Sequence, residues 1–305
     1  MHSLIESLWF HTRWYHLPLL IILFPLALLW GVLMGLRRFF AKEKDFGIPI
    51  VSVGNIVVGG TGKTPFLIEL LARYPKAFVI SRGYGRQSSG YLLVSQDGKI
   101  LVDVDKSADE PMLIAQLAKE CSVIVSEDRK FAIKKAQEMG AKVIFLDDGF
   151  NQVGIKKFNI LLKSENSSNT LPMPAGPYRE FSFFERCSDI VAIEGIDFAR
   201  SVDFENLGKK MVLVTAISNP ERLDRFLPKG IVGKYYFRDH SYFDEDNLKE
   251  ILAREGADRL LVTQKDLVKM VDFKLPLAII KLKLEIKEYI FDAVDNYIKG
   301  ESGER

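Results

Sequence analysis

Residues 51–71 read VSVGNIVVGGTGKTPFLIELL, and this stretch decides the fold class. Its first part is apolar and rich in valine, as a buried strand is, and its last part has the apolar spacing of a helix. Between them, residues 59–64 supply three glycines, two threonines and a lysine. A strand that turns through glycines into the first turn of a helix presents backbone N–H groups to an anion. The stretch therefore predicts a nucleotide-binding phosphate loop in an α/β fold.

The residues of this loop have separable roles. Phosphate binding is assigned to Gly59, Gly60, Thr61, Gly62, Lys63 and Thr64. Lys63 is expected to reach the β- and γ-phosphates and to serve in catalysis, and the Thr64 hydroxyl is expected to bind Mg²⁺. The loop is a variant, because Val57 stands where the standard G-x-x-x-x-G-K-[ST] spacing begins with glycine. ATP and Mg²⁺ are the predicted cofactors.

The rest of the chain indicates a parallel sheet with crossover helices. From residue 48, apolar runs alternate with stretches of helical periodicity. A second series of apolar runs starts near residue 158, and the polar stretch at residues 164–180 within it indicates an exposed connection. We predict a P-loop domain with a parallel sheet at residues 47–157 and a second, smaller α/β domain at residues 158–305.

The N-terminal part of the chain carries a membrane signal. Residues 17–36 contain no charged residue and match the length that crosses the hydrocarbon core of a bilayer. Arginines and lysines follow at once, so the positive-inside rule places the remainder of the chain in the cytoplasm. We predict an N-terminal hydrophobic membrane helix within residues 1–46. A helix that lies in the membrane interface, or a buried core helix of a soluble domain, has the same composition.

Composition and charge narrow the function classes. The chain has 305 residues, of which 48% are hydrophobic and 27% are charged, as in an ordinary folded protein. Its net charge of +2 gives no support for nucleic-acid binding. Cys121 and Cys187 lie far apart and form no CxxC pair, so neither a metal knuckle nor a disulfide scaffold is indicated. We expect both cysteines to be buried as small hydrophobic residues.

Acidic residues at the ends of predicted elements are the candidates for metal binding and catalysis. The apolar run at residues 143–146 delivers Asp147 and Asp148 to the carboxyl edge of a strand, where ligands of α/β sheets bind. We assign both aspartates to Mg²⁺. Asp109 and Glu110 open a helical run, so they either cap that helix or supply a general base and a further group for Mg²⁺.

Other polar stretches have the character of binding or catalytic loops. Residues 81–86 read SRGYGR and follow a predicted strand, so Arg82 and Tyr84 are candidates for contacts with an anion or a sugar. His240 stands beside an aspartate, where it either tunes a base or lies on the surface. Residues 263–266 read TQKD and lack the guanine-reading order N-K-x-D, so adenine is the expected base.

From these residues alone, three classes of nucleotide-binding protein stay open. A kinase transfers the phosphoryl group to an acceptor, a membrane-attached motor hydrolyses ATP without one, and a tethered sensor binds nucleotide without catalysis. A sensor is expected to tolerate the substitution Asp109→Asn. The chain lacks the LSGGQ signature of ABC-type ATPases, and it lacks the basic patches that a nucleic-acid motor needs.

The order of the motifs favours the kinase. The motifs GN-x3-GGTGKTP, SRGYGR, DEP, SEDR, LDDGF, PAGPYRE, RDH and TQKD follow one another between about residues 49 and 269. In this order they resemble those of the tetraacyldisaccharide 4′-kinases, the lipid A 4′-kinases. The resemblance implies a Mg²⁺- and ATP-dependent transfer of the γ-phosphoryl group to the 4′-hydroxyl of a membrane glycolipid, a tetraacylated glucosamine disaccharide 1-phosphate. It also implies work at the cytoplasmic side of the inner membrane, with neither nucleic acid nor an obligate protein partner.

Residue roles follow from the same resemblance. The catalytic aspartate of the family's DEP motif corresponds to Asp109, and the histidine of its dyad corresponds to His240. Asp109 is expected to accept the hydroxyl proton while His240 tunes or orients it. The resemblance implies that Glu110 binds the metal, together with the two aspartates of LDDGF. Substrate binding is assigned to Asn55, Arg82, Tyr84 and Arg129, which stand in the shared motifs.

The chain departs from the family pattern at a few positions. The family commonly has Gln-His after DDGF, where this chain has Asn151 and Gln152. It often has a second histidine where this chain has Ser241. These departures put details of acceptor binding in question and leave phosphoryl transfer as the expected reaction.

Overall fold

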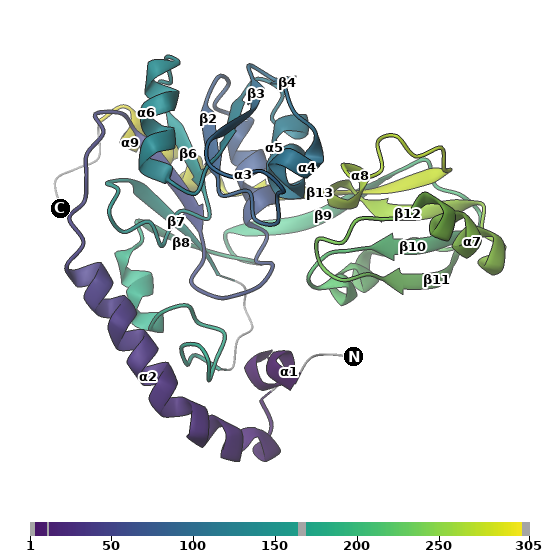
Figure 1. Cartoon of the computed structure of the whole chain (residues 1–305), viewed down its shortest axis with the longest axis horizontal. Coiled ribbons are helices and arrows are strands. Elements are labelled where there is room, and N and C mark those ends of the chain that lie inside the picture. Colours follow the sequence, from purple (N-terminus) through teal and green to yellow (C-terminus); the bar gives the residue numbers. More distant parts are fainter. Residues whose placement is uncertain (1–3, 11, 164–168, 301–305) are drawn as a thin grey trace. The chain divides into compact units, whose positions relative to one another are not determined.

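The structure, a computed structural model, describes residues 4–10, 12–163 and 169–300 and confirms the α/β class. Helices and strands alternate along most of the chain (Figure 1). By spatial contact the chain divides into two compact units. Unit 1 consists of the residues up to Lys63, Ile133–Ala199 and the residues from Ile286, and unit 2 consists of Thr64–Ala132 and Arg200–Glu285. The predicted boundaries near residues 46 and 157 divide the chain along its length and stay a prediction.

The elements are as follows in chain order. The helices are α1 (Leu4–Phe10), η1 (Trp14–His16), α2 (Leu17–Phe39), α3 (Lys63–Leu71), α4 (Val104–Ser107), α5 (Asp109–Leu117), α6 (Arg129–Glu138), η2 (Ser182–Cys187), η3 (Pro220–Phe226), α7 (Glu245–Glu255), α8 (Gln264–Leu267) and α9 (Glu288–Ile298). The strands are β1 (Ile50–Gly54), β2 (Phe78–Ser81), β3 (Leu92–Gln96), β4 (Lys99–Ile100), β5 (Ser122–Val125), β6 (Ile144–Asp147), β7 (Phe158–Lys163), β8 (Ile190–Ile193), β9 (Phe198–Glu205), β10 (Met211–Thr215), β11 (Ile231–Tyr236), β12 (Arg259–Thr263) and β13 (Leu277–Ile286).

Unit 1 contains parallel strands in the order β6-β1-β7-β8. Every residue of β1 and β6 is buried, which explains why both strands are almost continuously apolar. The register pairs Val53 of β1 with Asp147 of β6, so the loop after β1 and the aspartates at the end of β6 lie at the same edge of the sheet. Ligands of parallel sheets bind at the carboxyl ends of the strands, so this edge is the expected place for a site.

Unit 2 contains strands in the order β4-β3-β5-β2 and most of a second sheet in the order β11-β10-β12-β13-β9. β2 and β5 are parallel, and the hairpin of β3 and β4 is antiparallel. In the second sheet, the neighbours from β11 to β13 are parallel. Successive residues of β10 face opposite sides, so Val212 packs with Leu248 and Ile251 of α7, whereas Met211 belongs to the other core cluster.

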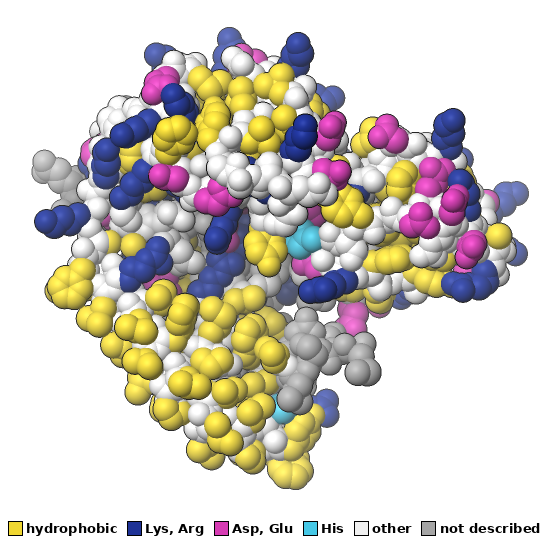
Figure 2. Space-filling view, in the orientation of Figure 1, with side chains coloured by type: hydrophobic (Ala, Val, Ile, Leu, Met, Phe, Trp, Pro, Cys, Tyr) yellow, Lys and Arg dark blue, Asp and Glu magenta, His cyan; other side chains and the backbone are white. Residues whose placement is uncertain are grey.

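The predicted N-terminal hydrophobic helix is present as α2 and extends to Phe39. The helical stretch Trp14–Phe39 is long and apolar enough to cross a membrane, and only 11% of its most apolar part is buried. A core helix of a soluble domain is mostly buried, so that alternative does not fit. Figure 2 shows hydrophobic side chains spread over the exposed surface of α2.

Two expectations about exposure are wrong. The stretch predicted as an exposed connection between β7 and β8 has buried residues in its described part, among them Ala175 and Tyr178. Residues 177–179 exchange backbone hydrogen bonds with residues 56–58, and this pairing explains the burial. Of the two cysteines predicted to be buried, Cys187 in η2 is exposed.

Candidate functional site

The phosphate loop follows β1 and leads into α3, as predicted. Gly59 and Gly62 have φ angles of +114° and +83°, in a region that residues with a Cβ atom rarely adopt, so the turn depends on glycine at both positions. Asn55 is fully buried, donates to Thr61 Oγ1 at 2.9 Å and accepts from Lys63 Nζ at 3.2 Å. This position favours a role for Asn55 in shaping the loop over the predicted contact with substrate.

At the same edge of the sheet, Asp148 contacts two cations. Arg179 Nη1 donates to both of its carboxylate oxygens, at 3.1 and 2.9 Å, and Lys63 Nζ lies 3.8 Å from Oδ1. Its neighbour Asp147 ends β6 and is 4% exposed. The structure thus joins Lys63, predicted to bind phosphates, to an aspartate predicted to bind metal. It also adds Arg179, for which the sequence predicts no role.

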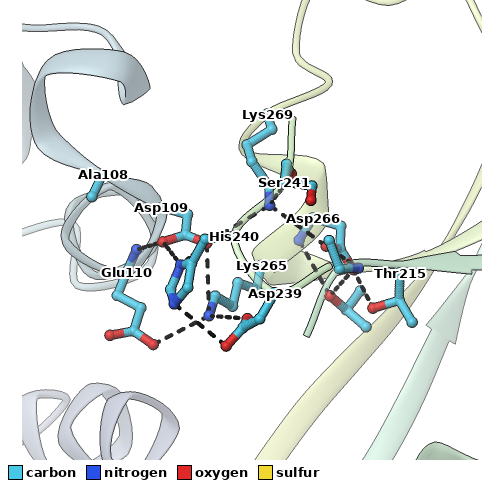
Figure 3. Close-up of polar contacts among 12 residues, drawn as sticks. Ala108, Asp109, Glu110, Thr215, Asp239, His240, Ser241, Lys265, Asp266 and Lys269 are labelled. Atoms are coloured by element: carbon cyan, nitrogen blue, oxygen red, sulfur yellow. Dashed lines mark hydrogen bonds and ion pairs between the residues drawn. The ribbon is translucent and has the colours of Figure 1, made fainter. Parts of the chain in front are cut away.

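Asp109 and His240 are in contact in unit 2, although 131 positions separate them along the chain. Asp109 begins α5, and His240 lies in the loop between β11 and α7. The His240 Nδ1 atom lies 2.9 and 3.0 Å from the two carboxylate oxygens of Asp109 (Figure 3). The side chain of Asp109 is only 5% exposed. The two residues predicted to act as a dyad therefore share a largely buried hydrogen bond.

Two lysines surround this pair. Lys265 Nζ lies 3.6 Å from Asp109 Oδ2 and 3.2 Å from Glu110 Oε1. Lys269 Nζ lies 3.7 Å from Asp109 Oδ2 and donates to the Ser241 carbonyl oxygen at 3.0 Å. Figure 3 shows both ammonium groups on the side of the second sheet, facing the first turn of α5. The acidic first turn of that helix is thus bound by side chains from a remote part of the sequence.

A buried aspartate joins α8 to β10. It thereby fixes the part of the chain that carries Lys265 and Lys269. Asp266 is fully buried and accepts hydrogen bonds from Thr215 Oγ1 at 2.6 Å and Thr263 Oγ1 at 2.7 Å. It also accepts from the backbone N–H of Ala216 at 3.0 Å. The Ala216 carbonyl oxygen accepts in turn from the His240 N–H at 3.2 Å. One carboxylate therefore positions both α8 and the loop that carries the histidine.

The charges around the dyad explain its ionisation. Burial alone raises the pKa of Asp109, but the hydrogen bond from His240 and the charges of the two lysines outweigh it and lower this pKa to about 2. The hydrogen bond to Asp109 raises the pKa of His240 above its ordinary value. Burial lowers the pKa of Lys265, yet the nearby carboxylates, Glu110 first, raise it overall. Asp109 is therefore an ionised carboxylate at neutral pH.

The backbone at the dyad is in an uncommon conformation. Ala108, directly before Asp109, has a φ angle of +74°, and His240 has a φ angle of +62°. A residue with a Cβ atom held in such a region costs about 1–3 kcal/mol of folding free energy. Strain of this kind gathers at functional sites, where surrounding contacts impose it. The strain thus lies at His240 itself and at the residue directly before Asp109.

The remaining residues assigned to substrate binding differ in exposure. Tyr84 is 72% exposed, and its ring centroid lies 5.8 Å from that of His240. Arg82, two positions earlier, is also exposed. Arg129, in contrast, is buried at the start of α6 and donates to the Ser126 carbonyl oxygen. Tyr84 thus lies beside the dyad, whereas the position of Arg129 favours a structural role.

The residues assigned to Mg²⁺ come from both units. Asp147 and Asp148 stand at the end of β6 in unit 1, and Thr64 and Glu110 stand in helices of unit 2. Over the described ranges, no group of three or more His, Cys, Asp or Glu side chains forms a metal site. A Mg²⁺ ion that binds through nucleotide phosphates takes only one or two protein carboxylates, so such a cluster is not required.

Four residues of these clusters carry no role predicted from the sequence: Arg179, Lys265, Asp266 and Lys269. The first three stand in the motifs PAGPYRE and TQKD, so a signal is present in the sequence. Their partners are more than 30 positions away along the chain in most cases, as the 155 positions between Lys265 and Glu110 illustrate. No local spacing reveals such contacts.

A glycine-rich loop at the carboxyl edge of a parallel sheet is typical of P-loop nucleotide-binding proteins, and a carboxylate poised to take a hydroxyl proton is what kinases add to it. By fold and site, the chain is a P-loop phosphotransferase. Residues 19–299 match the family described as Tetraacyldisaccharide-1-P 4'-kinase, and the chain belongs to this family. The resemblance inferred from the motif order is thereby confirmed.

Individual relatives agree with this assignment. The tetraacyldisaccharide 4'-kinase of Helicobacter acinonychis (strain Sheeba) is 43% identical over 296 residues, which are 95% of this chain and 95% of that protein. The enzyme of the same name from Aliarcobacter butzleri is 43% identical over 98% of both chains. The crystal structure of LpxK from Aquifex aeolicus, described as an "apo" form in complex with ATP, has a TM-score of 0.77 at 25% identity. That likeness covers 92% of this chain and 99% of the other.

Proposed function

We propose that this protein transfers the γ-phosphoryl group of ATP to the 4′-hydroxyl of a tetraacylated glucosamine disaccharide 1-phosphate, a step of lipid A biosynthesis. The contact between Asp109 and His240, in a chain that also has a phosphate loop, is the observation that carries the proposal. The name of the family supplies the acceptor, and the Aquifex aeolicus relative in complex with ATP supports the donor. A motor or a sensor has no need of a buried aspartate held ionised beside a histidine.

On the donor side, residues 59–64 bind the phosphates through backbone N–H groups, and Lys63 adds a positive charge at the β- and γ-phosphates. During transfer, a bond forms between the 4′-oxygen and the γ-phosphorus. The bond between that phosphorus and the bridging oxygen of ADP breaks. Arg179 holds Asp148 against Lys63 and so keeps this lysine in place.

On the acceptor side, Asp109 accepts the proton of the 4′-hydroxyl. A carboxylate with a pKa of about 2 is a weak base, so it suits a reaction in which the proton leaves late. Phosphoryl transfer is of this kind in most analyses, because the transition state is loose and the nucleophile bonds little before the leaving group departs. His240 orients the carboxylate, and the exposed ring of Tyr84 beside it offers a surface for a sugar.

Mg²⁺ belongs to this proposal as a partner of the nucleotide. Carboxylate and hydroxyl oxygens are the ligands it prefers, and Asp147, Asp148, Glu110 and Thr64 carry them. The oxygens of Asp148 and Glu110 also contact Arg179 and Lys265. When bound, the ion neutralises charge on the β- and γ-phosphates.

We also propose that α2 lies in the cytoplasmic interface of the inner membrane. One face of the helix packs against protein: Gly31 is buried, and Trp30 donates to the Arg179 carbonyl oxygen at 2.8 Å. A helix covered in this way is not free to be surrounded by lipid. The acceptor has four acyl chains, and each CH₂ group taken out of the bilayer costs about 0.8 kcal/mol, so the enzyme must work where the lipid is. The basic residues after α2 favour the anionic cytoplasmic leaflet.

A transfer assay tests the proposal. The full-length protein is incubated with ATP labelled at the γ position and tetraacyldisaccharide 1-phosphate in mixed micelles, and label is expected to enter the lipid. Asp109→Ala is expected to lower the transfer rate by about 10²- to 10⁴-fold, the usual worth of a general base. The control is Asp244→Ala, because Asp244 caps α7 by accepting from the Asn247 N–H at 3.0 Å and touches no reacting group.

Two results contradict the proposal. ATP hydrolysis without labelled lipid identifies a motor, and a near-normal rate in Asp109→Ala means that this residue is not the proton acceptor.

A further inference from the structure

Residues 177–180 lie in unit 1 between the membrane helix and the phosphate loop. They belong to the stretch between β7 and β8 and are followed by η2. On one side they contact α2, and on the other they contact the residues that lead into the loop. All of these contacts lie inside unit 1, so they form one continuous connection from α2 to the phosphate loop.

On the membrane side, α2 holds this segment by hydrogen bonds. Trp30 Nε1–H donates to the Arg179 carbonyl oxygen at 2.8 Å. Arg38 donates to both carboxylate oxygens of Glu180, at 3.0 and 2.6 Å, and the side chain of Glu180 is only 5% exposed. A guanidinium and a carboxylate joined in this two-pronged way form a strong and geometrically specific pair. The contacts from Trp30 to Arg38 extend over about two turns of the helix.

Close packing strengthens the same contact. Gly31 lies against the Phe181 ring so closely that a Cβ atom added to it would be 2.5 Å from the ring. The Arg38 guanidinium lies over the rings of Phe150 and Phe184, 4.7 and 5.3 Å from their centroids. The segment and α2 are therefore held together by packing as well as by hydrogen bonds.

On the other side, the segment pairs with the residues that precede the loop. The Arg179 N–H donates to the Ile56 carbonyl oxygen at 2.8 Å, and the Val58 N–H donates to the Pro177 carbonyl oxygen at 2.8 Å. Gly59, the first residue of the loop, comes directly after Val58. A shift of the segment therefore shifts the start of the loop.

The Arg179 side chain adds a second link, because it binds Asp148, which faces Lys63. We propose that Trp30 and Arg38 are positioning residues, through which α2 sets the geometry of the phosphate loop, so that seating of α2 in a lipid bilayer and ATP binding are coupled. The inference rests on the proposed function, in that residues 59–64 bind ATP and α2 lies at the membrane. Coupling follows when a bilayer favours the arrangement of α2 that also favours the nucleotide.

The test compares variants of the full-length protein in phospholipid vesicles. Trp30→Phe removes the N–H donor and keeps an apolar ring, and Arg38→Met removes both hydrogen bonds to Glu180 and keeps an apolar stem. Arg38→Met is expected to lower kcat/KM for ATP by up to about tenfold, because a hydrogen bond to a charged group is worth about that factor and only the part that positions the loop reaches the nucleotide. The effect of Trp30→Phe is expected to be smaller and in the same direction. The KM for the lipid acceptor and the binding to vesicles stay unchanged in both.

Trp14→Phe and Lys134→Met are the matched controls. Trp14 is 81% exposed before α2, and Lys134 is exposed in α6, away from the basic cluster after α2. Across the described part of the chain, neither donates to residues 177–180. Both variants lose the same type of side chain as the test variants and are expected to keep normal kinetics with ATP.

A double-mutant cycle separates positioning from general damage. When Arg179 is replaced by Met, Arg38→Met is expected to lower kcat/KM for ATP by less than it does in the wild type, because the side-chain link to Asp148 is gone and only the backbone pairing with residues 56–58 remains. Additive losses, or a loss no greater than that of Lys134→Met, overturn the inference. If Arg38→Met does not fold, the same cycle with Trp30→Phe decides.

Lys63→Ala distinguishes this inference from the proposed function. Normal ATP kinetics in Lys63→Ala contradict the proposed function itself. Normal kinetics in Arg38→Met and Trp30→Phe, beside an impaired Lys63→Ala, remove only the coupling between the membrane helix and the loop.

Discussion

At the scale of single residues, the contacts that position Asp109 also set how basic it is. His240 and two lysines hold its carboxylate ionised, with a pKa of about 2. The same neighbours fix its two oxygens in direction. In a loose transition state, the orientation of the base contributes more to the rate than its strength. Weak basicity at this position is therefore compatible with fast transfer. The positive φ angles of Ala108 and His240 indicate that the fold bears strain to obtain this orientation.

The pair predicts that folding stability depends on pH. The pKa of His240 is higher in the folded chain than its ordinary value of 6.5, so its contribution is fully present below that value and is lost as the pH rises through the folded pKa. The pKa of Asp109 falls from 3.8 to about 2 on folding, so its contribution is present above pH 3.8 and is lost as the pH falls toward 2. The pair therefore stabilises the fold most between these limits.

Asp109→Asn is accordingly expected to lower the melting temperature more at about pH 5.5 than at about pH 9, where His240 contributes less. Thermal unfolding of wild type and variant at both pH values measures the difference. His240→Gln removes the titrating ring. It is also expected to lower the melting temperature more at about pH 5.5 than at about pH 9. Equal losses at the two pH values contradict the assignment of the hydrogen bond.

At the scale of elements, α2 has one face that packs against protein and one that is exposed. Its packed face, which includes Ala27 and Gly31, is buried against protein. Most of its other large side chains are exposed, such as Leu29 at 57% and Ile21 at 72%. An exposed apolar surface of this extent marks a membrane or protein contact. The two faces predict opposite responses to substitution.

Leu29→Lys puts a charge on the exposed face and is expected to weaken flotation with vesicles while leaving the melting temperature in detergent nearly unchanged. Gly31→Val forces atoms into the Phe181 ring and is expected to lower stability by about 1–3 kcal/mol, the usual cost of overpacking. Flotation and thermal unfolding of the two variants, side by side, check this contrast. If Leu29→Lys unfolds the protein instead, the face taken to be exposed is part of the core.

Local patterns in the sequence were sufficient to predict β1, α3, β6 and α2, because each is specified by apolar periodicity and by glycines or charges next to it. The described part of the stretch at residues 164–180 was misjudged, because its burial comes from pairing with residues 56–58. Apolar runs do not predict β9, because buried or half-buried residues alternate with exposed ones along it. Turn-rich composition indicates a loop and says nothing about what covers it.

The candidate site was predictable to the same degree. Motifs predict Lys63, Asp109 and His240 as site residues, and the motif order pairs the last two, which are in contact in the structure. Lys269 was missed, because its contact with Asp109 joins the end of α8 to the start of α5, which only the fold brings together. Asn55 was found but given a role that its burial does not favour.

At the scale of the whole molecule, the candidate residues divide between the units. The phosphate loop up to Lys63, with Asp148 and α2, belongs to unit 1, and the pair of Asp109 and His240 belongs to unit 2. In the proposed function, nucleotide binding thus draws on unit 1 and proton acceptance draws on unit 2. Substitutions are therefore expected to separate the two activities.

Lys63→Ala is expected to weaken ATP binding by about tenfold or more, because a charged contact to the phosphates is lost, and to stop transfer with it. Asp109→Asn keeps the shape of the side chain and removes its charge, so it is expected to stop transfer while ATP affinity stays within about twofold of wild type. Titration with a fluorescent ATP analogue measures affinity, and labelled ATP measures transfer, on the same preparations. A parallel loss of affinity in Asp109→Asn assigns Asp109 to nucleotide binding and removes it as the proton acceptor.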